Sequence, residues 1–243
     1  MPFEIQAVKV GQWTDAGPRI FYLGDCSEEV LIYTYFWILR DGTNTVLFDV
    51  GVDYADGKAI YPGMIQQADE RPSVALAARG VSPEQVTHVV LSHLHWDHCT
   101  PTLDAYANAR IYVQRRELET VLSPPHPWFA NFTFPQTIAK LAGEWKDRVH
   151  LVDGEEEVLP GLRAFWTGGH TPGHQSLLVE TADGPVVLAG DVVFYGRSLA
   201  DDAPCGFNSS LVECLLAMER MRQMGCPVVP GHDPAVAESW GRK

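Results

Sequence analysis

The stretch SHLHWDHC at residues 92–99 constrains this chain more than any other, because it crowds three histidines and an aspartate into six positions. In an extended loop, residues two positions apart point the same way, so His93 and His95 can hold one ion together. Asp97 and His98 follow and can face a second ion. Imidazole and carboxylate groups suit zinc or another first-row divalent metal. The cluster therefore predicts metal binding, but two ions need more ligands than it supplies.

Three further ligands are expected where apolar strands end. His170 follows LRAFW within TGGHTPGH, Asp191 ends VVLAGD, and His232 lies in VVPGHD. Each lies near a glycine, where the backbone can turn and direct a side chain inward. All seven candidates map to one edge of the predicted sheets and can share one site. Seven ligands with one bridging carboxylate are what a site for two metal ions uses.

Strand and helix patterns alternate along the chain, which predicts one compact α/β domain of two similar halves over residues 1–243. Strands are expected over the first ten residues and at 29–40, 45–53, 87–92, 110–114, 149–152, 162–166, 175–180, 185–190 and within 226–233. Helices are expected at 73–79, 82–85, 115–122 and 209–224, and near the C-terminus. DGTN at 41–44 and ADG at 182–184 are turn signals between neighbouring strands.

The helix expected at 209–224 has recognisable ends and a predicted buried face. Ser209 or Ser210 can cap its start, Glu213 is spaced for a capping box, and Gly225 ends it. An apolar stripe is expected to face the core, formed by Leu211, Leu215, Met218 and Met221.

Residues 123–148 interrupt the alternation and are expected to be an insertion into the domain. The first part, SPPHPWFANFTFPQT at 123–137, is too rich in proline for regular structure and too apolar for a solvated linker. One interpretation is a loop held on the surface by its own aromatic side chains. The other is a wall or lid of an apolar pocket. The segment could also pair two subunits in a homodimer.

The chain is acidic, with 31 Asp and Glu residues against 18 Lys and Arg and a formal net charge of −13. Nucleic-acid binding needs a basic face, so that partner is not expected. The sequence has no apolar run that predicts a membrane span, and its N-terminal residues do not resemble a signal peptide. Five scattered cysteines without a CxxC pair are typical of free thiols in a reducing compartment. The expected location is the cytoplasm.

The pattern HxHxDH followed by separate His, Asp and His resembles the metallo-β-lactamase superfamily, from FWILRDGTNTVLFDVG to VVPGHD. The resemblance implies an αββα sandwich, with two mixed sheets face to face and helices outside. The implied ligands are His93, His95 and His170 for one ion, Asp97, His98 and His232 for the other, and Asp191 between them. Some members carry Glu at the position of His95 and run redox chemistry, so the histidine favours hydrolysis.

Within the superfamily, SHLHWDHCTPT and TGGHTPGHQSLLVET are most similar to the N-acyl-homoserine lactonases and related small-lactone hydrolases. In those enzymes a tyrosine shortly after the bridging aspartate contacts the substrate carbonyl. Here DVVFYGR offers Tyr195 as the catalytic donor, one position later than the pattern, with Phe194 in the expected place. His174 is expected to orient its turn, and Asp49 to orient a ligand histidine.

The resemblance implies hydrolysis of a cyclic ester, either an N-acyl-homoserine lactone or an aromatic fused lactone. Two divalent ions, zinc foremost with manganese, iron and cobalt left open, would share an attacking hydroxide held by Asp191, and Asp97 could carry a proton to the departing oxygen. Alternatives on the same ligands are a glyoxalase-II-like thioesterase and a hydrolase of cyclic or other amides. The remaining alternative is a module that binds metal without catalysing a reaction.

Overall fold

Two β-sheets packed face to face form the centre of the protein, whose computed structural model describes residues 1–241. The first sheet has the order β1-β2-β3-β4-β5-β6, with β1 (Glu4–Ala16), β2 (Glu29–Arg40), β3 (Thr45–Phe48), β4 (His88–Val90), β5 (Arg110–Gln114) and β6 (Val149–Val152). The second has the order β11-β10-β9-β8-β7, with β7 (Glu155–Leu159), β8 (Leu162–Trp166), β9 (Gln175–Thr181), β10 (Gly184–Leu188) and β11 (Val228–Val229).

Both sheets mix antiparallel and parallel pairs. Strands β1, β2 and β3 pair antiparallel, whereas β3 to β6 run parallel. In the second sheet β7 to β10 are antiparallel, and β11 adds in parallel to β10. The predicted turn between β2 and β3 forms because the Asp41 carboxylate accepts from the backbone N–H groups of Thr43 and Asn44, at 2.8 and 2.6 Å.

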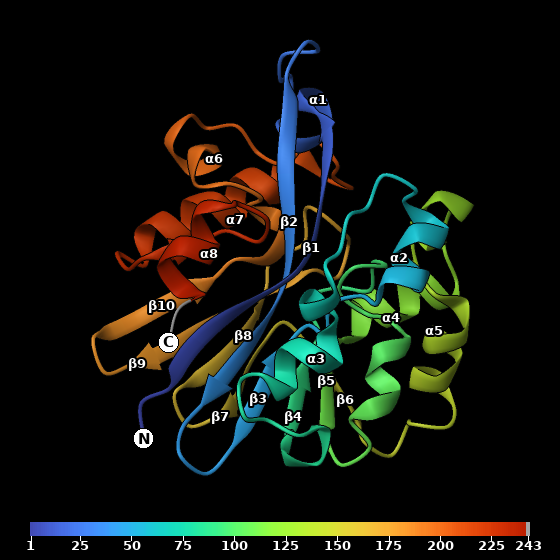
Figure 1. The fold of residues 1–243 in the computed structure, drawn as a ribbon. Coiled ribbons are helices and arrows are strands. Elements are labelled where there is room, and N and C mark those ends of the chain that lie inside the picture. The colour runs from blue at the N-terminus through green and yellow to red at the C-terminus, as the bar shows by residue number, and fades with distance from the viewer. Residues whose placement is uncertain (242–243) are drawn as a thin grey trace.

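Helices cover the outer faces of both sheets (Figure 1). They are α1 (Gly17–Ile20), α2 (Tyr54–Ile60), α3 (Pro72–Ala77), α4 (Arg115–Leu122), α5 (Pro135–Ala142), α6 (Gly196–Ala200), α7 (Leu211–Gln223) and α8 (Ala235–Trp240). Helices α3, α4 and α5 pack on the first sheet and α7 on the second. The predicted αββα sandwich is confirmed. Within residues 1–241, no helix is both long and apolar enough to cross a bilayer.

The apolar core has its centre between the two sheets. Trp37 and Phe48 of the first sheet pack there with Leu177 and Leu188 of the second. Strand β2 also buries its opposite face, where Phe36 joins the helix-covered cluster. Burial on both faces explains why EVLIYTYFWILR reads as a nearly continuous apolar run rather than an alternating one.

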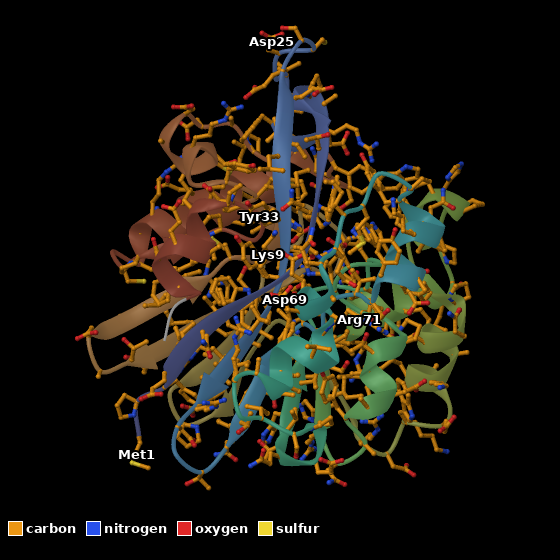
Figure 2. All side chains as sticks on the ribbon, in the orientation of Figure 1. Met1, Lys9, Asp25, Tyr33, Asp69 and Arg71 are labelled. Atoms are coloured by element: carbon orange, nitrogen blue, oxygen red, sulfur yellow. The ribbon has the colours of Figure 1, made fainter. Side chains whose placement is uncertain are left out.

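The strands that precede the predicted ligands end at one edge of the sandwich. Strands β8, β10 and β11 run in the same direction, so the loops after them emerge together, and the loop after β4 joins them. The hairpin of β1 and β2 extends past the sheets, and Asp25 lies at its tip while Met1 lies at the other end of the molecule (Figures 1 and 2). Lower on this hairpin, Lys9 Nζ lies 4.2 Å from the centre of the Tyr33 ring.

Residues 123–137 and strand β3 are two of the segments that depart from the sequence-based expectation. Residues 123–137 contain a 3₁₀ turn at Pro127–Ala130, and α5 begins at Pro135. Proline suits the first helical turn, where its missing N–H costs nothing, so proline content was a poor guide here. Strand β3 ends at Phe48 rather than at residue 53, because Asp49 adopts a positive φ of 61°.

Helix α7 begins at Ser210 as predicted, with the Ser210 hydroxyl accepting from the Glu213 backbone N–H. Its predicted buried face is partly wrong. Met218 and Met221 are fully buried, but Leu215 is 41% exposed. The core face is completed instead by Cys214 and Ala217. Because Cys214 and Ala217 are small, α7 can lie close to the glycine-rich loop beside it. The buried face of the helix is therefore turned away from Leu215.

The difference in burial between Met218 and Leu215 should appear as a difference in the stability of the two alanine variants. Met218→Ala should lower the free energy of unfolding by about 2–4 kcal/mol, because it leaves a cavity in a closed core. Leu215→Ala on the same helix should change it by less than about 0.5 kcal/mol. Urea denaturation of both variants at one pH checks the expectation. Equal losses for the two variants would show that α7 buries the stripe expected from the sequence.

Candidate metal centre

The structure brings all seven predicted ligand side chains together at the common edge of the two sheets. Six of them are buried, and His95 alone of the seven is partly exposed. Their donor atoms form three overlapping groups, each of which could hold an ion. The groups are His93, His95 and His170; His93, His98 and Asp191; and Asp97, His98 and His232. Their role as metal ligands remains a prediction.

The first group is built from three imidazole nitrogens. His170 Nε2 lies 3.2 Å from His93 Nε2 and 3.0 Å from His95 Nδ1. In the group of Asp97, His98 and His232, His98 Nε2 lies 3.3 Å from Asp97 Oδ2, and that oxygen is 3.8 Å from His232 Nε2.

Asp191 lies between the two groups, where the resemblance places a bridging ligand. Its Oδ2 atom is 3.0 Å from His232 Nε2 and 3.5 Å from His170 Nε2, and its Oδ1 atom is 3.3 Å from His98 Nε2. One carboxylate therefore faces both halves of the cluster.

Hydrogen bonds on the outer side of the cluster fix which nitrogen carries the proton. His170 Nδ1 donates to the Phe207 carbonyl at 2.8 Å, and His232 Nδ1 donates to the Tyr33 carbonyl at 2.7 Å. Because a carbonyl oxygen only accepts, the proton of each neutral ring lies on Nδ1, and Nε2 presents a lone pair to the cluster. Such pairing of the outer nitrogen is the usual support of a metal-binding histidine.

The inner face of the cluster presents acceptor atoms that suit a cation. His93 Nδ1 lies 2.9 Å from Ser92 Oγ, which donates to Asp49, so His93 Nε2 also offers a lone pair. It faces the lone pair of His170 Nε2 at 3.2 Å, an arrangement that repels unless a cation lies between them. Among the described residues, His98 Nε2 and Asp191 Oδ1 are buried without a hydrogen-bond partner. The residues therefore fit divalent metal ions.

Burial keeps three of the five imidazoles in the form that binds metal. It lowers the pKa of His95 to about 4 and that of His170 to about 3, and it holds the pKa of His93 well below the ordinary value. A neutral imidazole is the metal-binding form. Burial alone would oppose ionisation of Asp191, but His232 and His98 outweigh it and hold the pKa of Asp191 well below its usual range.

Asp49 supports two of the predicted ligands, as the sequence indicated. Its Oδ2 atom accepts from His98 Nδ1 and from the Ser92 hydroxyl, both at 2.8 Å, and its Oδ1 atom accepts from the Ser92 backbone N–H at 2.7 Å. Ser92 in turn orients His93. The left-handed backbone at Asp49 turns this carboxylate back toward the loop that follows β4.

His174 positions Asp191 rather than joining the cluster. Its Nε2 atom accepts from the Asp191 backbone N–H at 3.0 Å, and its Nδ1 atom donates to the Thr167 hydroxyl at 2.6 Å. Gly190 makes the approach possible: its φ is 60°, and a Cβ there would lie 2.8 Å from His174 Nε2. The prediction that His174 has a supporting role agrees with this geometry.

Glu117 on α4 is a supporting residue that sequence reasoning missed. Its buried carboxylate accepts from the Leu94 backbone N–H at 3.1 Å, the Thr171 hydroxyl at 2.8 Å and the Gly173 backbone N–H at 2.9 Å. It therefore connects the loop of His93 and His95 to the loop of His170. In RRELETVL it looks like one more charge on a polar helix, because its partners are remote in sequence.

A cavity of about 70 Å³ opens onto the cluster. Besides five cluster residues, its lining includes Trp13, Asp15, Arg19, Ile20, Ile32, Tyr61, Trp96, Phe132, Phe194 and Phe207. The lining is largely aromatic. Trp13, Trp96 and Tyr61 contact one another with ring centres 5.2–6.2 Å apart. Phe132 belongs to the 123–137 segment, so part of that segment forms a wall of this cavity.

Tyr195 does not lie where a catalytic donor would have to lie. Its hydroxyl donates to the Leu31 carbonyl, and its ring packs on Phe21 with ring centres 5.5 Å apart. Phe194 lines the cavity instead, 5.0 Å from the His232 ring and 5.4 Å from the His170 ring. The one-position offset in DVVFYGR directs the Tyr195 side chain to the β1–β2 hairpin, so this geometry gives no support to its expected catalytic role, which stays a prediction.

An αββα sandwich with a His/Asp cluster at the shared edge of its sheets defines a class of metal-dependent hydrolases. The Metallo-beta-lactamase superfamily profile matches residues 31–232 of this chain. The chain belongs to the metallo-β-lactamase superfamily, as its motifs predicted.

Several proteins similar to this chain are lactonases. The N-acyl homoserine lactonase AiiA of Bacillus thuringiensis subsp. kurstaki is 31% identical over 213 residues, which cover 81% of this chain and 80% of that protein. The fold matches a crystal structure of a quorum-quenching N-acyl homoserine lactone lactonase with a TM-score of 0.83, 22% identity, and coverage of 98% and 96% of the two chains. It also matches AidC, a dizinc quorum-quenching lactonase, with a TM-score of 0.74, 16% identity, and coverage of 96% and 88%.

The predicted similarity to N-acyl-homoserine lactonases is confirmed by these relatives. The predicted enzyme class, a metal-dependent hydrolase of ester bonds, is the class to which they belong.

The link made by Glu117 predicts weaker metal binding when it is lost. Glu117→Gln should lower zinc affinity about 10–100-fold, because an amide cannot accept all three hydrogen bonds and releases one of the two loops. Titration of metal-free protein with a zinc-competing chelator measures the affinity. Glu119→Gln, an exposed change on the same helix, is the control. Equal zinc affinity in both variants would contradict the positioning role.

The orientation of Tyr195 predicts a small effect of its hydroxyl on turnover. Tyr195→Phe should leave kcat/KM for a lactone within about twofold of the unchanged protein, since the lost hydrogen bond lies outside the cavity. Steady-state kinetics on metal-loaded protein check this. A loss of about 100-fold or more in kcat would show that the hydroxyl reaches the substrate after all.

Proposed function

We propose that this protein is a lactonase that opens a cyclic ester with two divalent metal ions, zinc foremost. The observation that carries the proposal is the buried cluster of seven His and Asp side chains with unpaired acceptors directed inward. Lactonase relatives, one of them described as dizinc, support both the reaction and the metal. N-acyl homoserine lactones are the substrate class that those relatives suggest.

In this proposal the residues around each ion have distinct tasks. His93, His95 and His170 would hold one ion, Asp97, His98 and His232 the other, and Asp191 would contact both. When bound, such ions supply Lewis acidity and a water with lowered pKa near the substrate carbonyl. Asp49, His174 and Glu117 keep the ligands in place through the hydrogen bonds described above, so that the cluster needs little rearrangement when an ion binds.

The open face of the cluster determines how a substrate could approach. Asp97 and Asp191 line the cavity, so their carboxylates lie beside any group bound there. Asp97 could take up the proton released by the attacking water and pass it to the departing ring oxygen, whereas Asp191 is shared by four imidazoles and is less free to do so. The aromatic lining excludes water and offers apolar contact to the acyl part of a lactone.

The thioesterase alternative receives less support from the cavity. A glutathione-type substrate carries carboxylates that require cationic partners. Among the described residues that line the cavity, Arg19 is the only Lys or Arg, and its Nε lies 3.3 Å from Asp15 Oδ2. A carboxylate-bearing substrate would have to compete with Asp15 for this single cation.

The proposed function can be tested with a substrate panel on metal-loaded protein. The panel comprises short and long N-acyl homoserine lactones, an aromatic fused lactone, a glutathione thioester and a cyclic amide, with acid release followed in a pH-stat. Lactones should be hydrolysed with the highest kcat/KM, and chelator treatment should abolish the activity. Faster turnover of the thioester or the amide would overturn the proposal in favour of that alternative.

The position of Asp191 between the two groups predicts that its charge is essential. Asp191→Asn should reduce bound metal below two ions per chain and lower kcat by more than about 100-fold, because the neutral amide no longer compensates two cations. Metal analysis and lactone kinetics on the same sample measure both effects. Asp183→Asn, an exposed change at the turn before β10, is the control. Full activity with a full metal complement in the Asp191→Asn variant would refute the bridging role.

A further inference from the structure

A second, smaller hollow lies behind the cavity that opens onto the metal centre. The two share four lining residues, namely His95, Phe132, His170 and Phe207. The rear hollow is about 10 Å³, which is at most enough for one water molecule. Val121, Trp128 and Phe129 give it an apolar end. The shared rings of Phe132 and Phe207 therefore separate the cavity at the metal centre from this small hollow, whose lining also includes Glu117, Thr120, Thr171 and Ser209.

Phe132 and Phe207 form this partition by direct contact. Their ring centres lie 5.4 Å apart with an interplanar angle of 85°, an edge-to-face pair. The Phe132 ring also lies 6.3 Å from the His95 ring, and the Phe207 ring lies 5.7 Å from it. The pair thus stands directly beside the ligand histidine that is most open to the cavity.

Phe207 is fixed by the metal centre itself. Its carbonyl accepts from His170 Nδ1 at 2.8 Å, and its backbone N–H donates to the Arg19 carbonyl at 2.8 Å. Any movement of Phe207 would disturb His170. Phe132 has no such tie to a predicted ligand among the described residues, so it is the member of the pair that can change without disturbing the cluster.

The backbone of Phe132 is held in an unfavourable conformation. Its φ is 65°, a left-handed value that a bulky residue rarely adopts. The neighbours hold it there: the Asn131 N–H donates to the Trp128 carbonyl at 3.2 Å, and the Thr133 hydroxyl donates to the Ala130 carbonyl at 2.9 Å. A conformation that costs free energy and yet directs a ring into the cavity indicates that the ring's position matters for function.

We propose that Phe132 is a specificity-determining residue that limits the length of the acyl group the enzyme accepts. The proposal rests on the lactonase function argued above. With Phe132 in place, the cavity ends at the Phe132–Phe207 pair, and a compact acyl group fills it. Without the ring, the two hollows join into one channel with an apolar end formed by Val121, Trp128 and Phe129. An unbranched acyl chain is the class of ligand that fits such a channel.

The test compares N-butanoyl, N-hexanoyl and N-decanoyl homoserine lactones on the metal-loaded enzyme and on Phe132→Ala. For the unchanged enzyme, kcat/KM should fall as the chain lengthens. In Phe132→Ala the ratio of kcat/KM for the decanoyl over the butanoyl substrate should rise about tenfold or more, because six additional methylenes gain apolar burial. The rise should come from a lower KM for the decanoyl substrate.

Two further variants make the result specific. Phe129→Ala enlarges only the rear hollow, so alone it should leave the chain-length profile unchanged. Phe132→Gly removes the ring and suits a positive φ, so it should widen the range as Phe132→Ala does while resisting urea better. If Phe132→Ala does not fold, Phe132→Gly still allows the test.

Specific outcomes would overturn the proposal. One is an unchanged chain-length profile in both Phe132 variants, and another is an unchanged enzyme that already prefers the decanoyl substrate. If no lactone is hydrolysed by any form, the proposed function fails. The role of the Phe132–Phe207 pair as a partition can then still be tested by calorimetry, which measures binding of N-decanoyl- and N-butanoyl-homoserine to the zinc-loaded protein. Tighter decanoyl binding in the Phe132 variants supports it, and equal binding in all forms rejects it.

Discussion

The structure depends on the compensation of one buried carboxylate. Asp191 lies within 3.8 Å of an imidazole nitrogen from each of four histidines, namely His93, His98, His170 and His232. A carboxylate removed from water is costly unless opposite charge or hydrogen bonds replace the water. The histidines that surround it come from loops of both sheets, and their outer nitrogens need acceptors such as the Tyr33 and Phe207 carbonyls. The closed sandwich, including the short strand β11, is what brings these groups together.

The sequence allowed the candidate site residues to be predicted where they belong to local motifs. HxHxDH and the three later ligands each follow an apolar strand, so sheet topology alone collects them, and Asp49 and His174 could be assigned because they adjoin these motifs. Long-range packing was not readable in the same way. Glu117 finds its partners only through the tertiary fold, Tyr195 turns away through a one-residue offset, and Leu215 is exposed because smaller neighbours set the rotation of α7. Proline and aromatic content hid the helix that starts at Pro135.

The cavity and the metal cluster share the ligand loops, but part of the cavity wall comes from other segments of the chain. The ligands lie in the loops after β4, β8, β10 and β11, and those loops are held by many hydrogen bonds. Much of the aromatic lining comes from the β1–β2 hairpin, the 123–137 segment and the loop before α7. A ring in the first two of these segments can change without altering a ligand. Phe207, by contrast, lines the cavity and also supports His170, so a change there would affect both the cavity wall and the cluster.

The carboxylate of Glu117 has a consequence for the relation between the two halves of the molecule. One of its oxygens accepts from a loop of the first half and the other from a loop of the second. The halves therefore cannot slide past each other at this edge without losing hydrogen bonds in a dry environment. Helix α4 contributes no ligand, but through Glu117 its position affects how the two ligand loops lie relative to each other. A substitution that tilts α4 relative to the sheet should therefore disturb the cluster more than one on its exposed face.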